Sequence, residues 1–183
     1  MSTVRFLLRL PSALHRLLTE RADAHGLSLN EYCVRRLAGP ESIAVAHPGA
    51  MAIRARAGAV AGRHLAGLIL HGSWTRGEAR STSDVDVLVV VDRREALTRA
   101  LYRTWDAVPL SWDGRSVDVH FIHLPDNPDR AGAVWCEAAI DGVVLDDRGG
   151  RVESTLRQIR RAIAEGRLVR RHAHGQPYWT VAA

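Results

Sequence analysis

Residues 4–10 alternate with the two-residue period of a β-strand, because every second side chain from Val4 to Leu10 is apolar and two of the three between them are arginines. From Ser12 the apolar spacing becomes that of an amphipathic helix, which ends near Gly26. Ser28, followed by Glu31 three residues later, predicts a capping box at the start of a second helix. One strand and two short helices cannot bury a core alone, so residues 1–38 must pair with a second copy or rest on the remaining chain.

Residues 39–50 contain two prolines and two glycines and are predicted to be a linker. Beyond them, strand-like apolar runs alternate with runs of helical spacing, which indicates an α/β layer arrangement. We therefore predict a core over residues 51–150 and, over residues 151–183, a C-terminal helix with a basic tail. The predicted strands lie at about 65–70, 84–91, 116–124 and 142–147, and the predicted helices at about 50–64, 93–106, 129–140 and 151–165.

The composition is that of a globular protein, with 183 residues, of which 46% are hydrophobic and 25% charged. No apolar run approaches the roughly 18–20 residues that span a membrane. We therefore expect no membrane partner. Cys33 and Cys136 have no CxxC companion, so we expect reduced thiols in a cytoplasmic protein. All 25 basic residues are arginines, and both ends of the chain are basic while its middle is slightly acidic. This distribution permits contact with a polyanion at either end.

Two aspartates, Asp84 and Asp86, stand at the start of a strand whose continuation is wholly apolar. They project from the same face of that strand, and two carboxylates that close stay ionised together only beside a cation or in full solvent. Asp118 has a similar place in a later strand, so neighbouring strands would bring three carboxylates together. Such acids suit Mg²⁺, which takes few protein ligands and completes its shell with water and a triphosphate. The Gly72-Ser73 turn could approach phosphate oxygens closely.

The pattern GS, ten residues, DVD and a distal VDV resembles the polymerase-β-like nucleotidyltransferases, especially the minimal nucleotidyltransferases, over residues 50–150. The stretch WTRGEARSTSDVDVLV is similar to that subgroup's GSxARGxAxxxSDIDLLV, with Trp74-Thr75 in less strict positions. The resemblance implies a mixed sheet with flanking helices. It also implies transfer of a nucleoside monophosphate from an NTP, with ATP expected first and Mg²⁺ or Mn²⁺ as the metal.

The same resemblance assigns roles to individual residues. Asp118 would complete the second metal site and help to activate the acceptor hydroxyl. Arg76 has two open roles, contact with phosphate or support of the adjacent helix. The implied catalytic and metal-binding residues are Asp84, Asp86 and Asp118, and the implied nucleotide-binding residues are Gly72, Ser73, Arg76 and Ser83.

Residues 3–38 resemble the ribbon-helix-helix proteins of the HicB-like antitoxin type, on the stretch RFLLRLPSALHRLLTERADAHGLSLNEYCVRRL. In that family two chains pair their strands into a ribbon that enters the DNA major groove. The resemblance therefore implies a DNA-binding homodimer or higher even oligomer. Leu7 can touch only a thymine methyl group, so a unit kept for dimerisation alone stays an alternative. The implied DNA-binding residues are Arg5, Leu7, Arg9, Ser28 and Asn30.

Three functions are compatible with these patterns. The first is an enzyme that transfers a nucleoside monophosphate to a protein or RNA hydroxyl within an autoregulated toxin–antitoxin module, with a cognate toxin protein or tRNA as partner. The second is a DNA-binding antitoxin or repressor whose nucleotidyltransferase fold mainly binds a partner. The third, an antibiotic nucleotidyltransferase, gives the N-terminal unit no evident use. In the tail, Arg170, Arg171, Tyr178 and Trp179 could bind a nucleic acid by charge and stacking, or belong to a solvated helix face.

Overall fold

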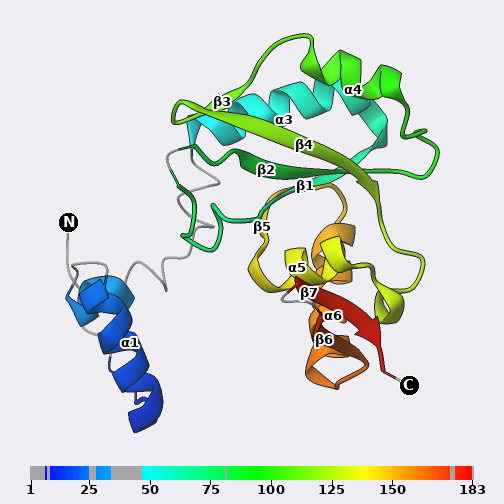
Figure 1. Cartoon of the computed structure of the whole chain (residues 1–183). Coiled ribbons are helices and arrows are strands. Elements are labelled where there is room, and N and C mark those ends of the chain that lie inside the picture. The colour runs from blue at the N-terminus through cyan, green and yellow to red at the C-terminus, as the bar shows by residue number, and fades with distance from the viewer. Residues whose placement is uncertain are drawn as a thin grey trace. The chain divides into compact units, whose positions relative to one another are not determined.

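The alternating strand and helix patterns form a mixed α/β fold in this computed structural model (Figure 1). The chain divides into two units, Met1–Pro40 and Glu41–Ala183. Throughout the described segments, no helix has both the length and the apolar character needed to cross a membrane. The structure describes residues 7, 9–24, 28–33, 47–80, 82–173 and 176–182.

The first unit contains the two predicted helices. α1 (Ser12–Ala24) confirms the first of them, and a short helix is described over residues 29–33. The backbone N–H of Glu31 donates to Ser28 Oγ at 3.1 Å, which confirms Ser28 as the N-cap of this second helix. Most of the predicted N-terminal strand, including Arg5, lies outside the described residues. Leu7 and Arg9 are described, are exposed, and do not belong to a strand within the single chain.

The second unit is built on a five-stranded sheet. Its strands are β1 (Leu65–His71), β2 (Val85–Val91), β3 (Ser111–Trp112), β4 (Arg115–His123) and β5 (Val143–Asp147). The strand order is β3-β4-β2-β1-β5, with β2 and β4 parallel and the other pairs antiparallel. β1 and β2 consist almost wholly of buried apolar residues, as expected of central strands covered on both faces. The predicted mixed sheet is therefore confirmed.

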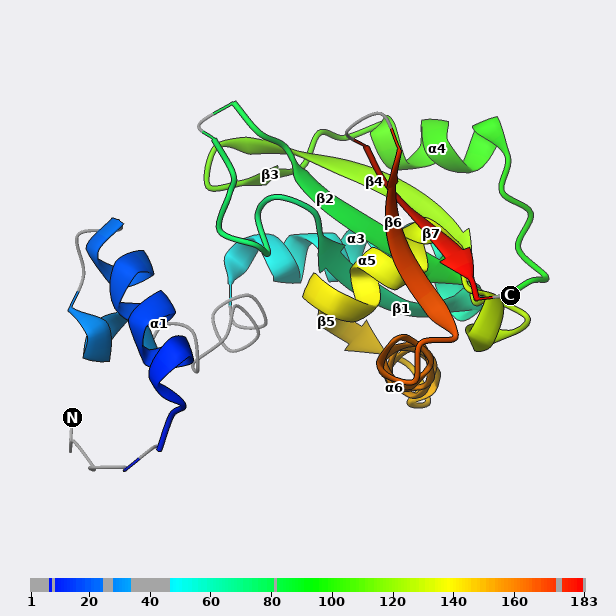
Figure 2. The ribbon, with the colours of Figure 1, turned by 60° about the horizontal axis from the view of Figure 1, so that its bottom comes forward.

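Helices cover both faces of this sheet. They are α3 (Pro48–Ala61), α4 (Arg99–Asp106), α5 (Ala133–Asp141) and α6 (Arg151–Ala164). α3 and α4 pack on one face, and α5 and α6 pack on the other (Figures 1 and 2). The first half of β4 stays partly exposed, and this is where Asp118 lies. Large core side chains include Ile53, Trp105, Trp112 and Phe121 on the first face and Trp135, Leu156 and Ile159 on the second.

Two of the helix boundaries that differ from the predictions have a clear local cause. α3 begins at Pro48, inside the predicted linker, because His47 Nδ1 accepts the N–H of Gly49 at 3.0 Å and proline suits the first helical position. The helix predicted over residues 93–106 begins only at α4, where Thr98 is the N-cap. The residues before Thr98 form turns and irregular backbone. They were predicted as helix because several of them are charged residues with a high helix propensity.

Two hairpins were missed in the sequence. Asp113 and Gly114, with φ angles of 49° and 76°, form the two-residue turn between β3 and β4. The segment predicted to be a basic tail folds into a second hairpin, β6 (Leu168–Ala173) and β7 (Gln176–Val181). The interpretation of this tail as a solvated helix face is therefore wrong. Its strand-favouring residues pair with each other, and Trp179 packs against the core on the α5 and α6 side.

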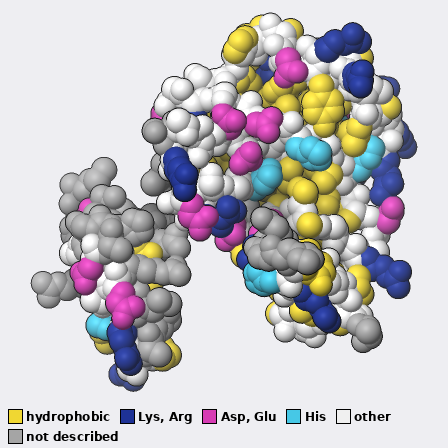
Figure 3. Space-filling view, viewed as in Figure 1, with side chains coloured by type: hydrophobic (Ala, Val, Ile, Leu, Met, Phe, Trp, Pro, Cys, Tyr) yellow, Lys and Arg dark blue, Asp and Glu magenta, His cyan; other side chains and the backbone are white. Residues whose placement is uncertain are grey.

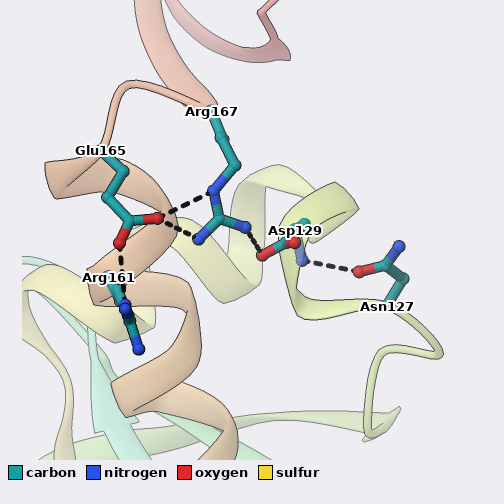
Figure 4. A network of polar contacts seen from close by, with 5 residues as sticks. All are labelled: Asn127, Asp129, Arg161, Glu165 and Arg167. Atoms are coloured by element: carbon teal, nitrogen blue, oxygen red, sulfur yellow. Dashed lines mark hydrogen bonds and ion pairs between the residues drawn. The ribbon is translucent and has the colours of Figure 1, made fainter.

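A polar network fastens the end of α6 to the loop before α5 (Figure 4). Glu165 Oε1 accepts from Arg161 Nε at 2.8 Å, and Glu165 Oε2 accepts from Arg167 Nε at 3.0 Å. Arg167 also pairs with Asp129, whose backbone N–H donates to Asn127 Oδ1 at 2.9 Å. The network holds the chain where it leaves α6 and enters the C-terminal hairpin.

We expect Glu165→Gln to weaken the pH dependence of stability. The hydrogen bonds from Arg161 and Arg167 lower the pKa of Glu165 below its ordinary 4.5. The unfolded chain therefore binds more protons, so the stabilisation is present above pH 4.5 and is lost as the pH falls through the lowered pKa. Thermal unfolding between about pH 3 and 6 measures the effect, which about 1 M NaCl should also reduce. Equal acid sensitivity of both proteins would contradict this prediction.

Candidate active site

The register of β2 and β4 brings two of the three predicted carboxylates together. Asp86 and Asp118 are direct partners in this parallel pair. Their side chains therefore leave the same face of the sheet, about 5 Å apart along the hydrogen-bonding direction. Asp84 precedes β2 by one residue and shares this face because of the two-residue period. On the other side of Asp86, β1 places His71 as its antiparallel partner.

The predicted phosphate-binding turn begins where β1 ends. Gly72 has a φ angle of 82°, a conformation that costs glycine little. A Cβ atom at this position would lie 2.1 Å from Asp86 Oδ2, far inside the contact distance. Glycine is thus required here both for the turn and for the close approach of the backbone to the carboxylate. This contact connects the GS motif to the aspartates in space.

The raised pKa of Asp86 indicates that little positive charge surrounds this carboxylate. Its pKa is raised by burial first and then by the charges of Asp118 and Asp84, while Arg76 opposes the shift. Within the described segments, the side chain of neither Asp86 nor Asp118 takes part in a hydrogen bond or an ion pair. The pKa of His71 is lowered, mainly by burial and then by His120 and Arg76. His71 is therefore neutral near pH 7 and does not compensate the carboxylates.

A divalent cation fits the chemistry of this donor set. Among the described residues, no three His, Cys, Asp or Glu side chains stand together as a group that could hold a metal ion. Asp86, which is partly buried, and Asp118, which is exposed, nevertheless face each other across β2 and β4, and neither side chain has a donor among the described residues. Mg²⁺ and Mn²⁺ prefer oxygen ligands, and Mg²⁺ needs only one or two protein carboxylates when a triphosphate supplies the others. The residues present fit such an ion.

Asp84 is held by the start of β4. Ser116 Oγ donates a short hydrogen bond to Asp84 Oδ1. Arg115 donates to the backbone carbonyls of Arg80 and Ser83, so it ties the loop before β2 to the β3–β4 hairpin. Ser83 Oγ accepts the N–H of Arg80 at 2.9 Å and stabilises the loop itself. The side chain of Ser83, predicted to bind nucleotide, is therefore engaged in its own loop.

Arg76 follows the same turn and pairs with Glu78. Its Nε donates to Glu78 Oε2 at 2.8 Å, and this hydrogen bond is the main cause of its raised pKa. The N–H of Glu78 donates to the carbonyl of Ser73 at 2.9 Å, which closes the turn. Arg76 thus supports the loop after the GS motif, and it also lines the adjoining cavity.

A cavity of about 570 Å³ adjoins the carboxylates. The end of β1, the following turn, α5 and the C-terminal hairpin form its walls. Acidic side chains, histidines and arginines are exposed on the face of the unit that Figure 3 shows. The polar lining residues that the sequence prediction missed are His71, Glu78, Glu137 and Asp141. His71 could have been found from the sequence, because it directly precedes the GS motif. The others come close to this motif only in the tertiary fold.

Comparison with known proteins agrees with both resemblances. Residues 58–133 match the family described as a nucleotidyltransferase domain, and residues 4–37 match the HicB family. No curated protein matches the chain. The solved structure "Crystal structure of the toxin-antitoxin with AMP-PNP" is similar at 14% identity and a TM-score of 0.40, over 64% of this chain and 86% of that chain. The two matches thus assign a similarity to nucleotidyltransferase domains to part of the second unit and a similarity to the HicB family to part of the first.

Proposed function

We propose that the second unit transfers a nucleoside monophosphate from an NTP, with ATP as the first candidate, to a hydroxyl group of a protein or RNA. The observation that carries this proposal is the pairing of Asp86 with Asp118 beside Gly72, inside the stretch that matches the nucleotidyltransferase domain. Carboxylates next to a close backbone turn suit a metal-bound triphosphate.

The reaction is a displacement at the α-phosphorus. The acceptor oxygen forms a bond to this phosphorus, the bond to the oxygen bridging to the β-phosphate breaks, and pyrophosphate leaves. In the proposed scheme the carboxylate of Asp118 receives the proton of the acceptor hydroxyl. The backbone of Gly72 and Ser73 orients the phosphates, and Arg76 adds positive charge beside them.

Asp84, Asp86 and Asp118 would hold the divalent ion. When bound, Mg²⁺ neutralises the charge on the phosphate oxygens and helps to align the attacking and leaving oxygens. The hydrogen bond from Ser116 and the loop contacts of Arg115 position Asp84 for this role. Asp86 is partly buried and its side chain has no donor among the described residues, so a bound cation would compensate its charge.

The test is a transfer assay with each of the four α-labelled NTPs, with and without Mg²⁺. Protein and RNA pools serve as acceptors, and label in the acceptor is measured together with released pyrophosphate. We expect Mg²⁺-dependent labelling with matching pyrophosphate release. Neither label nor pyrophosphate with any NTP, from protein that is folded by circular dichroism, would overturn the proposal.

We further propose that the first unit dimerises and binds DNA, which would make the chain part of an autoregulated toxin–antitoxin module. The match of residues 4–37 to the HicB family supports this role, and so does the capped second helix, whose first N–H groups can face phosphate. The alternative is an antitoxin or repressor whose nucleotidyltransferase fold mainly binds a partner. Binding of Mg·NTP distinguishes the enzyme from this alternative.

Arg9→Ala should weaken binding to the promoter of the protein's own operon more than binding to random DNA. An arginine that contacts guanine with two hydrogen bonds contributes about 1–3 kcal/mol of discrimination. The logarithm of the affinity should also fall with the logarithm of the salt concentration, by about 0.9 per phosphate neutralised. Fluorescence anisotropy at several salt concentrations measures both effects.

Arg170→Ala, which removes the same charge from the second unit, is the control and should not change the preference for the promoter. If the wild-type protein fails to bind this DNA at low salt, the first unit serves dimerisation alone. Light scattering of a chain that lacks residues 1–46 then tests that role, because the truncated chain should form a smaller assembly.

A further inference from the structure

Three aromatic rings are in contact one after another, from the start of the second unit to the turn of the GS motif. His47, the first residue of this unit that the structure describes, stacks on Trp112 of β3, with ring centroids 4.2 Å apart and planes 8° from parallel. Trp74, directly after Ser73, contacts the same indole edge to face, with centroids 5.1 Å apart at an angle of 71°. We refer to His47, Trp112 and Trp74 as the ring series.

His47 is held at both of its ring nitrogens. Its Nδ1 atom accepts the N–H of Gly49, so the ring proton lies on Nε2, which donates to Asp113 Oδ1 at 3.0 Å. Gly49 allows the start of α3 to pack on the indole, because a Cβ atom there would lie only 2.8 Å from Trp112 Cε3. The imidazole thus caps α3 and joins it to the turn between β3 and β4, which lies beside the start of this helix (Figure 1).

Trp112 contributes to these contacts through the area of its ring. Its side chain is fully buried, and among the described residues its Nε1 atom has no hydrogen-bond partner. A buried N–H group without a partner lowers stability. The indole therefore acts here by its shape, which fills the space between His47 and Trp74.

The β3–β4 hairpin, which carries Trp112, contacts both halves of the proposed site. Through Trp112 it supports Trp74 in the GS turn. Arg115, the partner of Trp112 in the hairpin, donates to two carbonyls of the loop before β2. Ser116 donates to Asp84. A displacement of this hairpin would therefore move the GS turn and Asp84 together.

We propose that the ring series holds the GS turn in place for nucleotide transfer, and that His47 is a positioning residue for this reaction through its stacking on Trp112. This role rests on the proposed nucleotide transfer and adds to it a residue that lies before the matched stretch 58–133. The N-cap hydrogen bond stabilises α3, whereas the stacked ring fixes the hairpin and, through Trp74, the turn. A misplacement of about 1 Å can cost about 10²-fold in rate, so the loss of the ring should lower kcat more than it raises KM.

Two substitutions of His47 separate the ring from the cap. His47→Asn keeps a side-chain acceptor for the N-cap and removes the ring, whereas His47→Phe keeps the ring and has no acceptor. Both lose the hydrogen bond to Asp113, so this loss is matched. We expect His47→Asn to lower kcat at least about tenfold with KM for the NTP within about threefold of wild type. His47→Phe should keep kcat within about threefold of wild type, while its Tm falls by about 2–4 °C.

Amide hydrogen exchange of the full chain, followed by NMR, gives a measurement that does not depend on activity. The N–H groups of Gly77 and Glu78 donate to carbonyls within the GS turn at 3.1 and 2.9 Å, so their exchange reports the opening of this turn. They should exchange at least about tenfold faster in His47→Asn than in wild type or His47→Phe. The N–H of Arg167, which donates to a carbonyl of α6 at 2.9 Å, is the internal control and should not change.

Trp74→Leu, which removes the ring at the other end of the series, completes the test. If His47 acts through the rings, the double variant His47→Asn/Trp74→Leu should exchange no faster at Gly77 and Glu78 than Trp74→Leu alone. Additive effects, equal exchange in His47→Asn and His47→Phe, or a wild-type kcat in His47→Asn would overturn the inference. If the wild-type protein transfers no nucleotide at all, the proposed function fails, and the exchange rates still decide whether the rings hold the turn.

Discussion

Asp86→Asn is expected to lower nucleotide transfer on the order of 10³-fold, because it removes the charge that pairs with Asp118 around the proposed cation. The substitution keeps the shape of the side chain, so the sheet should remain intact. The transfer assay with α-labelled ATP measures the loss. Activity within about tenfold of wild type would show that Asp86 does not hold the ion.

The same substitution should raise the stability of the metal-free protein at neutral pH. Folding raises the pKa of Asp86 above its ordinary 3.8. Between the two pKa values the folded chain binds more protons than the unfolded chain, so the free energy of unfolding falls as the pH rises through this interval. Above this pH interval the folded state bears the full cost of keeping Asp86 ionised, and the substitution by asparagine removes that cost.

We therefore expect Asp86→Asn to unfold about 1–3 °C higher than wild type at pH 7 in the presence of a chelator. Near pH 3, where both states of wild type are protonated, the difference should vanish. Added Mg²⁺ should raise the Tm of wild type more than that of the variant. A Tm of the variant below that of wild type at pH 7 would contradict the interpretation of Asp86 as an uncompensated carboxylate.

Gly72→Ala is expected to reduce transfer by at least about 10²-fold, because its methyl group would occupy the place of Asp86 Oδ2. The positive φ angle adds a backbone cost of about 1–2 kcal/mol. Asp86 must rotate away or the turn must open, and either change separates the GS motif from the carboxylates. Steady-state kinetics and thermal unfolding measure the two effects.

Gly77→Ala separates the steric effect from the backbone effect. Gly77 has a similar φ angle of 71°, but a Cβ atom there would meet nothing within 4 Å. We expect a loss of stability of about 1–2 kcal/mol and activity within about twofold of wild type. If Gly72→Ala and Gly77→Ala lose activity equally, the close approach of Gly72 to Asp86 is not the reason why the turn is needed for transfer.

The carboxylate site could be predicted because its signals are local. The two-residue period sets Asp84 and Asp86 on one face, and the apolar run after them indicates a central strand. From the sequence alone, Asp86 and Asp118 could be placed together only on the assumption that their strands are neighbours. The pairing of β2 with β4, in which Asp86 lies opposite Asp118, confirms this assumption. The role of these residues in metal binding stays a prediction.

The cavity could not be predicted, because its walls come from segments far apart in the chain. Glu137 and Trp179 are 42 residues apart and meet only when the C-terminal hairpin packs against α5. The hairpin itself was missed because its arginines suggested a solvated tail, whereas strand pairing and the packing of Trp179 decide its structure.

The sequence by itself determined the order of the main strands and helices of the second unit, the central apolar strands and the chemical character of the two motifs. These features depend on side-chain period, capping and turn residues, which act over a few positions. Only the tertiary structure decided which strands are neighbours, which carboxylate Gly72 approaches and which segments line the cavity. Such features depend on long-range packing, in which the position of each side chain is set by residues distant in the sequence.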